Sequence, residues 1–271
     1  MFDKMIGFIG AGNMGRAMIG GILASSFAST GQIIASASSV TTLEKIKNKF
    51  SIETTLSNET VARKSDILFL AVKPNKFDDI IPVISDCVKS QCVIVSVAAG
   101  KTISAIEQSF GRQIKLVRAM PNTPALVGEA MSALCCNANV TSDELEQVKT
   151  IFQCFGKCEC VPESLFDAVI GVSGSSPAYV FLMLEAMADA AVADGLPRKS
   201  AYQFAAQAVL GAAKMVLATG EHPGVLKDAV CSPAGTTIEA VAALEESGFR
   251  SAVIQAQRAC SAKSREMNKM Q

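Results

Sequence analysis

The stretch Met5-Ile6-Gly7-Phe8-Ile9-Gly10-Ala11-Gly12-Asn13-Met14-Gly15 decides the fold of this 271-residue chain. A short apolar run leads directly into the pattern G-x-G-x-x-G, and an amphipathic segment follows. Gly10 permits a tight turn, Gly12 lets a pyrophosphate approach the backbone, and Gly15 allows a helix to pack closely on the strand. The helix N-terminus then faces the phosphates. The motif therefore predicts a dinucleotide site with contacts from Ile9, Gly10, Ala11, Gly12, Asn13, Met14 and Gly15.

Beyond this motif, short apolar runs alternate with amphipathic stretches. Strands are expected at residues 5–10, 32–37, 66–72, 92–97, 114–120 and 128–137. Helices are expected to start near Asn13, Thr41, Asn75, Thr102 and Thr141, and Thr41 with Glu44 and Thr141 with Glu144 have the spacing of capping boxes. This alternation predicts an α/β fold, a Rossmann-like doubly wound sheet that is mostly parallel. We assign residues 1–163 to this NAD(P)-binding domain.

From residue 164 to 271 the pattern predicts an all-α C-terminal domain, with helices over 177–193, 197–219, 224–230, 236–247 and from 249 onward. Residues 178–193 carry only two charged side chains, Glu185 and Asp189, and residues 201–218 carry only Lys214. A helix that is apolar on all sides must be buried on all sides, and a small domain has little interior to offer. We therefore predict that this domain dimerises. A single-chain bundle of unusual composition is the alternative.

The composition excludes several classes of function. Twenty-five basic and 25 acidic residues give a net charge of zero, which does not favour a nucleic-acid partner. No long uninterrupted apolar run predicts a membrane span, and the first residues run straight into a strand, so we expect no targeting peptide. Nine irregularly spaced cysteines suggest free thiols in the reducing cytoplasm.

Cysteine and histidine usage also limits the chemistry. Cys154, Cys158 and Cys160 lack the second pair of ligands that a structural zinc site needs, so we predict no metal and expect these side chains to be buried on a strand and its approach. The single histidine, His222, precedes Pro223 and is expected in a loop or helix cap. The reaction should therefore be one that needs no histidine as acid or base.

The end of the second strand indicates which nucleotide is bound. Residues 35–39 read ASASS and contain no carboxylate to hold a ribose 2′-hydroxyl, which favours NADPH. No arginine is present either, so NADH remains allowed. Ser36 and Ser38 are candidates for phosphate contacts, with ordinary turn serines as the alternative. Asn58, further along the sequence, is another cofactor candidate.

Other candidates follow the later strands, because ligands of open α/β sheets lie beyond the carboxyl ends of the strands. Val72 and Lys73 close one strand and are placed for cofactor or substrate. Ala98 and Ala99 are small enough to let a flat nicotinamide approach. Asn122 has the chemistry to anchor a carboxamide, although a role in the turn fits equally well.

Residues 223–245, PGVLKDAVCSPAGTTIEAVAALE, resemble the signature segment of pyrroline-5-carboxylate reductases. The segments GFIGAGNMG, DILFLAVKP, SVAAG, RAMPNTPA, GVSGSSPAY and GFRSAVIQA occur in that family's order and spacing, so the resemblance covers the whole chain. The family often has Gly at the position of Ala234 and Ser at that of Cys231, and some members have Asn at that of Ala229. These departures bear on cofactor preference.

The resemblance implies the site residues of the second domain. Gly235, Thr236 and Thr237 begin a helix whose N–H groups and dipole suit a carboxylate, although a simple helix cap would look the same. By the resemblance, Thr236 and Thr237 bind substrate, and the Thr237 hydroxyl lies near the ring nitrogen. Substrate-binding candidates are Glu163, Ser232, Gly235, Thr236 and Thr237; catalytic candidates are Thr237 and Lys73.

The expected reaction is hydride transfer from NAD(P)H to the C=N bond of 1-pyrroline-5-carboxylate, which yields proline. The resemblance also implies a homodimer with intertwined helical domains and allows a larger ring of dimers. A reductase of another cyclic imine is one alternative. A β-hydroxyacid dehydrogenase-like enzyme would need a catalytic lysine on the first long helix, and residues 171–193 contain none. A non-enzymatic dimer that senses nucleotides is a further alternative. Such a protein would not need the 232–237 segment, which is intact here.

Overall fold

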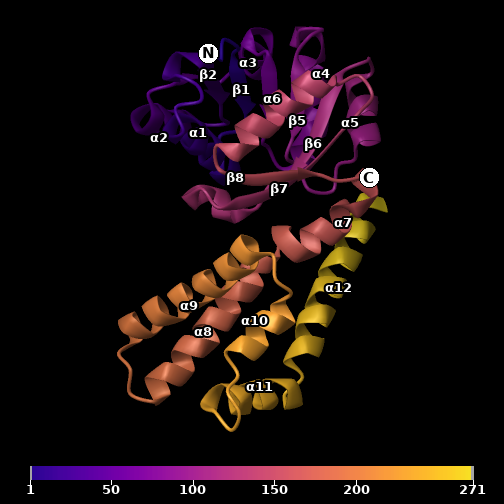
Figure 1. The fold of residues 1–271 in the computed structure, drawn as a ribbon. Coiled ribbons are helices and arrows are strands. Elements are labelled where there is room, and N and C mark those ends of the chain that lie inside the picture. Colours follow the sequence, from indigo (N-terminus) through magenta and orange to yellow (C-terminus); the bar gives the residue numbers. More distant parts are fainter. Residues whose placement is uncertain (1, 270–271) are drawn as a thin grey trace. The chain divides into compact units, whose positions relative to one another are not determined.

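The computed structural model describes residues 2–269 (Figure 1). Residues 2–175 together with 260–269 form one compact unit, and residues 176–259 form a second. The division predicted between residues 163 and 164 remains a prediction. The two units are described separately below.

An eight-stranded sheet forms the centre of the first unit, in the order β3-β2-β1-β4-β5-β6-β7-β8. The strands are β1 Ile6–Ile9, β2 Ile33–Ser36, β3 Glu53–Thr55, β4 Ile67–Leu70, β5 Val93–Ser96, β6 Lys115–Met120, β7 Ala130–Cys136 and β8 Gly156–Cys160. The first six are parallel, β7 pairs antiparallel to β6, and β8 pairs parallel to β7. The predicted Rossmann-like doubly wound sheet is confirmed, and its order places β1 between β2 and β4.

Helices cover both faces of this sheet (Figure 1). They are α1 Asn13–Ala24, α2 Val40–Phe50, α3 Asn58–Lys64, α4 Phe77–Ile84, α5 Ile103–Phe110 and α6 Ser142–Gln153. Successive strand residues point to opposite faces, so Phe8 packs in the core beneath α1, α2 and α6, whereas Ile9 packs in the core beneath α3, α4 and α5. Two cores hold one sheet, which fixes the loops at its carboxyl edge.

Short 3-10 turns and one π-helical turn complete the connections. They are η1 Thr30–Gln32, η2 Pro74–Lys76, η3 Ser85–Cys87, η4 Thr123–Val127, η5 Glu163–Leu165 and η6 Ile170–Gly174, with the single-turn helix α7 Phe166–Val169 between the last two. The Thr141–Glu144 capping box is confirmed. The Thr41–Glu44 box is wrong, because α2 starts earlier and Ser39 accepts from the Thr42 N–H as its cap.

The cysteines near the sheet edge behave differently from one another. Cys158 and Cys160 lie on β8 and Cys154 at the end of α6, as the expected strand and its approach require. Their predicted burial is wrong: Cys160 is exposed, and Cys154 and Cys158 are partly buried. All nine cysteines are free, and the described residues contain no cluster of groups that could hold a metal ion.

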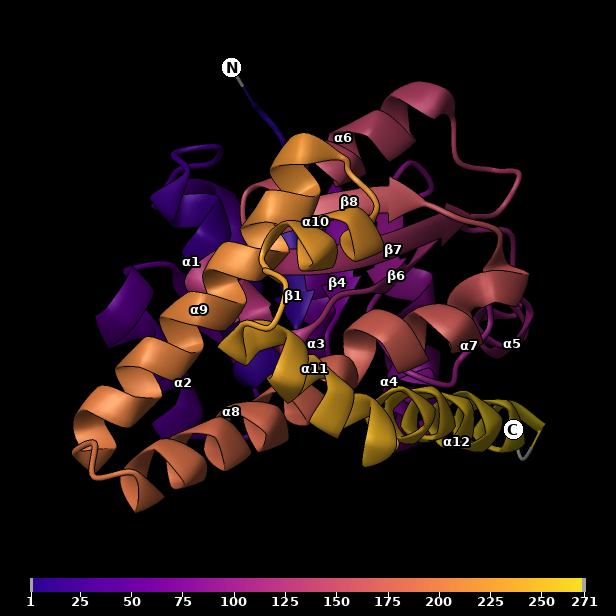
Figure 2. The same ribbon diagram turned by 60° about the horizontal axis from the view of Figure 1, so that its bottom comes forward.

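The second unit is helical. Its helices are α8 Ser176–Ala193, α9 Arg198–Thr219, α10 Pro223–Ala229 and α11 Thr236–Glu246, and it includes the beginning of α12 Phe249–Lys269. Figures 1 and 2 show α8 and α9 side by side as a hairpin, which Gly195 in a left-handed conformation turns. Within α8 only Ala188 is buried, and Phe181, Leu182 and Met187 are exposed. The helices that the sequence predicts to be buried against a second subunit thus expose their apolar side chains to solvent in the single chain.

One continuous helical stretch, Glu163–Ala193, is long and apolar enough to cross a membrane by length and composition alone. A helix that a second subunit covers has the same composition. Its N-terminal part is held by α12, because Ser264 and Asn268 both donate to the Asp167 carboxylate, at 2.5 and 3.0 Å. This polar anchoring is typical of a folded domain, and the expectation of no membrane span remains a prediction.

Candidate active site

The glycine turn after β1 has the geometry that its sequence predicts. Gly10 has φ +96°, and a Cβ there would lie 2.7 Å from the Ala71 carbonyl oxygen. A Cβ on Gly15 would lie 2.4 Å from the Gly10 carbonyl oxygen, so α1 packs directly on the turn. A Cβ on Gly12 would meet nothing within 4 Å. The turn is therefore closed where the backbone packs and open where a pyrophosphate would approach, in front of an α1 N-terminus that no side chain caps.

A cavity of about 390 Å³ lies at the carboxyl ends of β1, β2 and β4. It is lined by Gly10, Ala11, Gly12, Ser36, Ala37, Ser38, Thr42, Leu56, Asn58, Ala71, Val72, Lys73, Lys76 and Ile80. The predicted cofactor residues of three separate strands thus share one cavity. The sequence interpretation missed six lining residues, although Thr42 and Lys76 lie only a few positions beyond Ser38 and Lys73. The six are Ala37, Thr42, Leu56, Ala71, Lys76 and Ile80.

The two serine candidates differ in their surroundings. Ser36 is fully buried, and its hydroxyl donates to the Asn58 side chain at 2.7 Å. Ser38 is exposed and faces the cavity. Ser36 therefore holds Asn58 at the cavity wall, whereas Ser38 is free to reach a phosphate.

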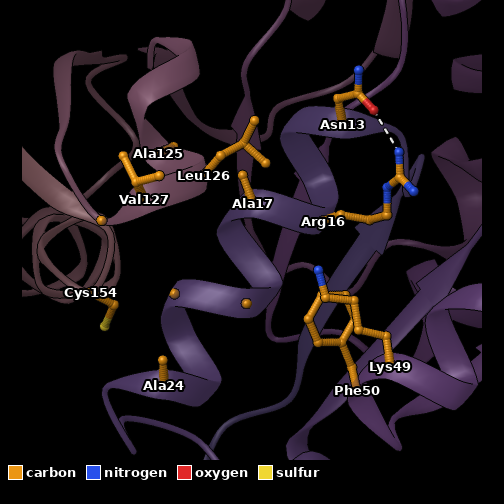
Figure 3. Close-up of a pocket in the computed structure, with 13 residues that line it drawn as sticks. Asn13, Arg16, Ala17, Ala24, Lys49, Phe50, Ala125, Leu126, Val127 and Cys154 are labelled. Carbon is orange, nitrogen blue, oxygen red and sulfur yellow. Dashed lines mark hydrogen bonds between the residues drawn. The ribbon is translucent and has the colours of Figure 1, made fainter. Parts of the chain in front are cut away.

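Asn13 turns its side chain toward the flank of α1. Arg16 donates to the Asn13 Oδ1 at 2.5 Å and to the Gly12 carbonyl at 3.3 Å. Figure 3 shows this pair at the rim of a separate cavity of about 500 Å³, between α1, Phe50 and the η4 turn that carries Leu126 and Val127. The Asn13 side chain thus lines this flanking cavity and not the cavity at the strand ends, and its contact with a dinucleotide remains a prediction.

Ala98 and Ala99 follow β5. Ala98 is buried, and Ala99 lines a further cavity of about 300 Å³ with Gly100, Ile170, Ser175, Cys260, Lys263, Ser264 and Met267. This cavity lies within the first unit, because the end of α12 belongs to that unit. The side chains at this strand end are small, and the approach of a flat nicotinamide ring to them remains a prediction.

Asn122 is buried, and its amide is used inside the protein. Its Nδ2 donates to the Ser173 carbonyl at 3.1 Å, and its Oδ1 accepts from the Met131 N–H at 3.0 Å. These contacts are those expected of a residue that fixes the turn. A contact with the cofactor remains a prediction.

Glu163 lies at the start of η5 and is tied to two other elements. Its Oε1 accepts from Arg118 on β6 at 2.8 Å and from the Ile103 N–H at the start of α5, also at 2.8 Å. The Arg118 guanidinium lies 4.5 Å from the centre of the Phe166 ring. The sequence interpretation named Glu163 but missed Arg118, which holds it.

The remaining candidates form one loop in the second unit. The Gly235 N–H donates to the Ser232 carbonyl at 3.1 Å, and a Cβ on Gly235 would lie 2.2 Å from the Ser232 hydroxyl. Ala234 between them has φ +55°, a conformation that favours glycine. Gly235 is the N-cap of α11, and no side chain caps this helix, so N–H groups at Thr236 and Thr237 face outward from its first turn. Nearby, His222 caps α10 through its Nδ1, which confirms the expected cap.

Two thiols of the first unit, those of Cys92 and Cys135, are poor nucleophiles. Burial raises the pKa of both Cys92 and Cys135 to about 12. Only the thiolate attacks or ligates readily, so these side chains are suited to packing. The candidate groups for chemistry at the site are the open helix N-termini, the hydroxyls, the lysines and Glu163.

Two family models match the chain. Residues 163–267 match the model for pyrroline-5-carboxylate reductase dimerisation, and residues 5–100 match that for coenzyme F420-dependent NADP oxidoreductases. Pyrroline-5-carboxylate reductase from Escherichia coli K12 is 50% identical over 98% of this chain and 99% of its own length. The chain belongs to the pyrroline-5-carboxylate reductase family.

Further members of the family agree over the full length. The Methanosarcina acetivorans reductase is 44% identical over 99% of this chain and 100% of its own length. The Plasmodium falciparum pyrroline carboxylate reductase, solved with NADP bound, superposes with a TM-score of 0.90 at 32% identity and covers 99% of both chains. The family's dimerisation region includes α8 and α9, so the exposed apolar side chains of these helices belong to an oligomerisation domain.

Proposed function

We propose that this chain is a pyrroline-5-carboxylate reductase that uses NADPH to reduce the C=N bond of 1-pyrroline-5-carboxylate and so forms L-proline. One observation carries the proposal: a relative of that name is 50% identical over nearly the whole chain. The open glycine turn and the 232–237 loop before the uncapped helix α11 fit this activity. When bound, NADPH supplies the hydride.

The first unit has residues suited to hold this cofactor. Backbone N–H groups at Gly10–Gly15 would hold the pyrophosphate, because Gly12 leaves its approach open. Ser38 and Asn58 would contact the adenosine end, and Val72 and Lys73 would flank it. Ala98 and Ala99 would leave space for the nicotinamide.

The second unit has residues suited to hold the substrate. The N–H groups of Thr236 and Thr237, at the positive end of the α11 dipole, would bind the carboxylate beside Gly235, whose own N–H donates to the Ser232 carbonyl. The Thr237 hydroxyl would accept a hydrogen bond from the protonated ring nitrogen. Because the iminium already carries its proton, alignment and carboxylate binding suffice and no histidine acid is needed. Glu163, held by Arg118, completes the proposed set.

We further infer an intertwined homodimer that assembles into a ring of dimers and works in the cytoplasm. Phe204 on α9 is 69% exposed in the single chain and is typical of the side chains that such an interface would bury. The nine unpaired cysteines fit a reducing compartment.

The test is NADPH consumption by the purified chain with 1-pyrroline-5-carboxylate and, side by side, with its six-membered homologue 1-piperideine-6-carboxylate. We expect the five-membered ring to give the higher kcat/KM and proline to be the product. Faster turnover of the six-membered ring would assign the chain to another cyclic imine, and no consumption with either would reject the proposal.

A further inference from the structure

The cavity at the carboxyl ends of β1, β2 and β4 is positively charged. Of the described residues that line it, Lys73 and Lys76 are the charged ones. Leu56, Val72 and Ile80 supply apolar surface for a flat ring. The cavity is therefore suited to an anionic ligand with a planar base, such as the adenosine end of a phosphorylated dinucleotide.

The second lysine is placed by a rigid turn. Pro74 begins η2, and the Lys76 N–H donates to the Lys73 carbonyl at 2.9 Å, so the two lysines are separated by a single 3-10 turn. The Lys76 Nζ lies 3.0 Å from the Asp79 carboxylate, in the first turn of α4. Both side chains are more than half exposed, and Asp79 does not line the cavity. Exposed pairs of this kind are weak, on the order of 0–1 kcal/mol.

We propose that Lys76 is a specificity residue for NADPH: it breaks its ion pair with Asp79 and binds the ribose 2′-phosphate. This inference rests on the proposed function. The end of β2, where the 2′ position falls in this fold, has neither a carboxylate nor an arginine. A 2′-phosphate close to its dianionic form attracts an ammonium group more strongly than a carboxylate does. NADH has no charge at that position, so with NADH Lys76 stays paired with Asp79.

The long lysine stem makes this exchange feasible. Lysine carries a compact charge on a flexible four-carbon chain, and the cavity wall already includes Lys76 together with Ser38 and Thr42. Hydroxyls from the β2 end and an ammonium from η2 would then contact the same phosphate. The chain would gain preference for NADPH without the arginine that this position usually uses.

The experiment measures binding of 2′,5′-ADP and of 5′-AMP by calorimetry at low salt, because the two probes differ only in the 2′-phosphate. We expect Lys76→Gln to weaken the affinity for 2′,5′-ADP by about fivefold to tenfold, which is the scale of one partly solvated charged hydrogen bond. The affinity for 5′-AMP should stay unchanged. Asp79→Asn, which removes the competing carboxylate, should leave 2′,5′-ADP bound as tightly or more tightly.

The matched control is Lys64→Gln. Lys64 is also exposed and paired with a carboxylate, that of Glu53, but it does not line the cavity. Equal binding of 2′,5′-ADP by wild type and Lys76→Gln, or an equal loss in Lys64→Gln, would overturn the inference. The proposed function fails separately, when neither NADPH nor NADH is consumed with the imine.

Discussion

Arg118 on β6 and Glu163 at the start of η5 form an ion pair at 2.8 Å across 45 positions of sequence. The Arg118 side chain is 3% exposed and that of Glu163 is 33% exposed, so the Glu163 carboxylate and the Phe166 ring compensate the buried charge of the arginine. The same carboxylate oxygen accepts from the Ile103 N–H. The Glu163 side chain therefore joins the sheet and α5 to the helical stretch that begins at residue 163.

Arg118→Met should destabilise the first unit and weaken the placement of Glu163. Breaking a fully buried pair costs about 3–5 kcal/mol, and because solvent screens Glu163 we expect about 2 kcal/mol here. Denaturant unfolding measures this loss. Arg118→Lys keeps the charge but loses the flat contact with Phe166, so it should be destabilised less. Equal stability of the Arg118→Met variant and the wild-type protein would show that the pair contributes nothing.

Acid should weaken the contact between β1 and β4 through Asp66. Burial raises the pKa of this carboxyl, but hydrogen bonds from Lys89 and the Met5 N–H, with the charges of Lys89 and Lys4, outweigh it and lower the pKa below its ordinary value. A lowered pKa in the folded state stabilises the fold above the unfolded pKa, and that stability is lost as pH falls through the folded value.

The free energy of unfolding of wild type should therefore fall more steeply than that of Asp66→Asn below about pH 4. Above that pH the variant should be the less stable protein, and in acid the gap should narrow. Denaturant titrations over this range measure both effects. Lys89→Met removes the lysine that donates to the Asp66 carboxylate. The pH dependence of its unfolding free energy should therefore lie closer to that of Asp66→Asn. Parallel pH profiles would argue against a role for Asp66.

Local pattern predicted most of the first unit for physical reasons. β1, β4 and β5 are continuous apolar runs because both faces of the sheet are covered. β3, Glu-Thr-Thr, has no apolar run and little burial, so periodicity gave it no signal. α2 begins at Val40 because Ser39 caps it, one of several adjacent Ser and Thr residues that fit equally well in sequence.

Long-range partners could not be predicted in the same way. Nothing near Glu163 in sequence points to Arg118, and only the sheet brings β6 beside it. Lys76 is visible two residues after Pro74, but its relevance depends on the 3-10 turn that returns it to the cavity. The exposed surface of α8 and α9 was the exception, because apolar composition on all sides predicts a missing partner directly.

Ala234→Gly should stabilise the loop before α11. Ala234 has φ +55°, which costs an alanine about 1–2 kcal/mol relative to glycine, and part of that gain is offset because glycine is more flexible when unfolded. We expect a net gain of roughly 0.5 kcal/mol in thermal unfolding at fixed protein concentration. Ala240→Gly, inside α11, should have the opposite sign. A loss at both positions would mean that the loop does not hold Ala234 in this conformation.

Thr237→Ala should separate substrate chemistry from cofactor binding. Thr237 lies in the first turn of α11, and its hydroxyl is proposed to meet the ring nitrogen, while every cofactor candidate lies in the first unit. Loss of one hydrogen bond in a partly buried site is worth about 1–1.5 kcal/mol, so turnover should fall roughly tenfold. The dissociation constant for NADPH, followed by fluorescence, should stay within about twofold of wild type.

The control for Thr237 is Thr219→Ala, at the end of α9, where the hydroxyl donates to the Met215 carbonyl. That variant loses a threonine hydroxyl of the same helical unit and should keep normal turnover. Equal turnover of Thr237→Ala and wild type would remove the hydroxyl from the mechanism and leave only the backbone of the 235–237 turn. A parallel loss of NADPH affinity would instead mean that the loop acts on the cofactor, since a residue that contacts only the imine changes the rate and leaves cofactor binding intact.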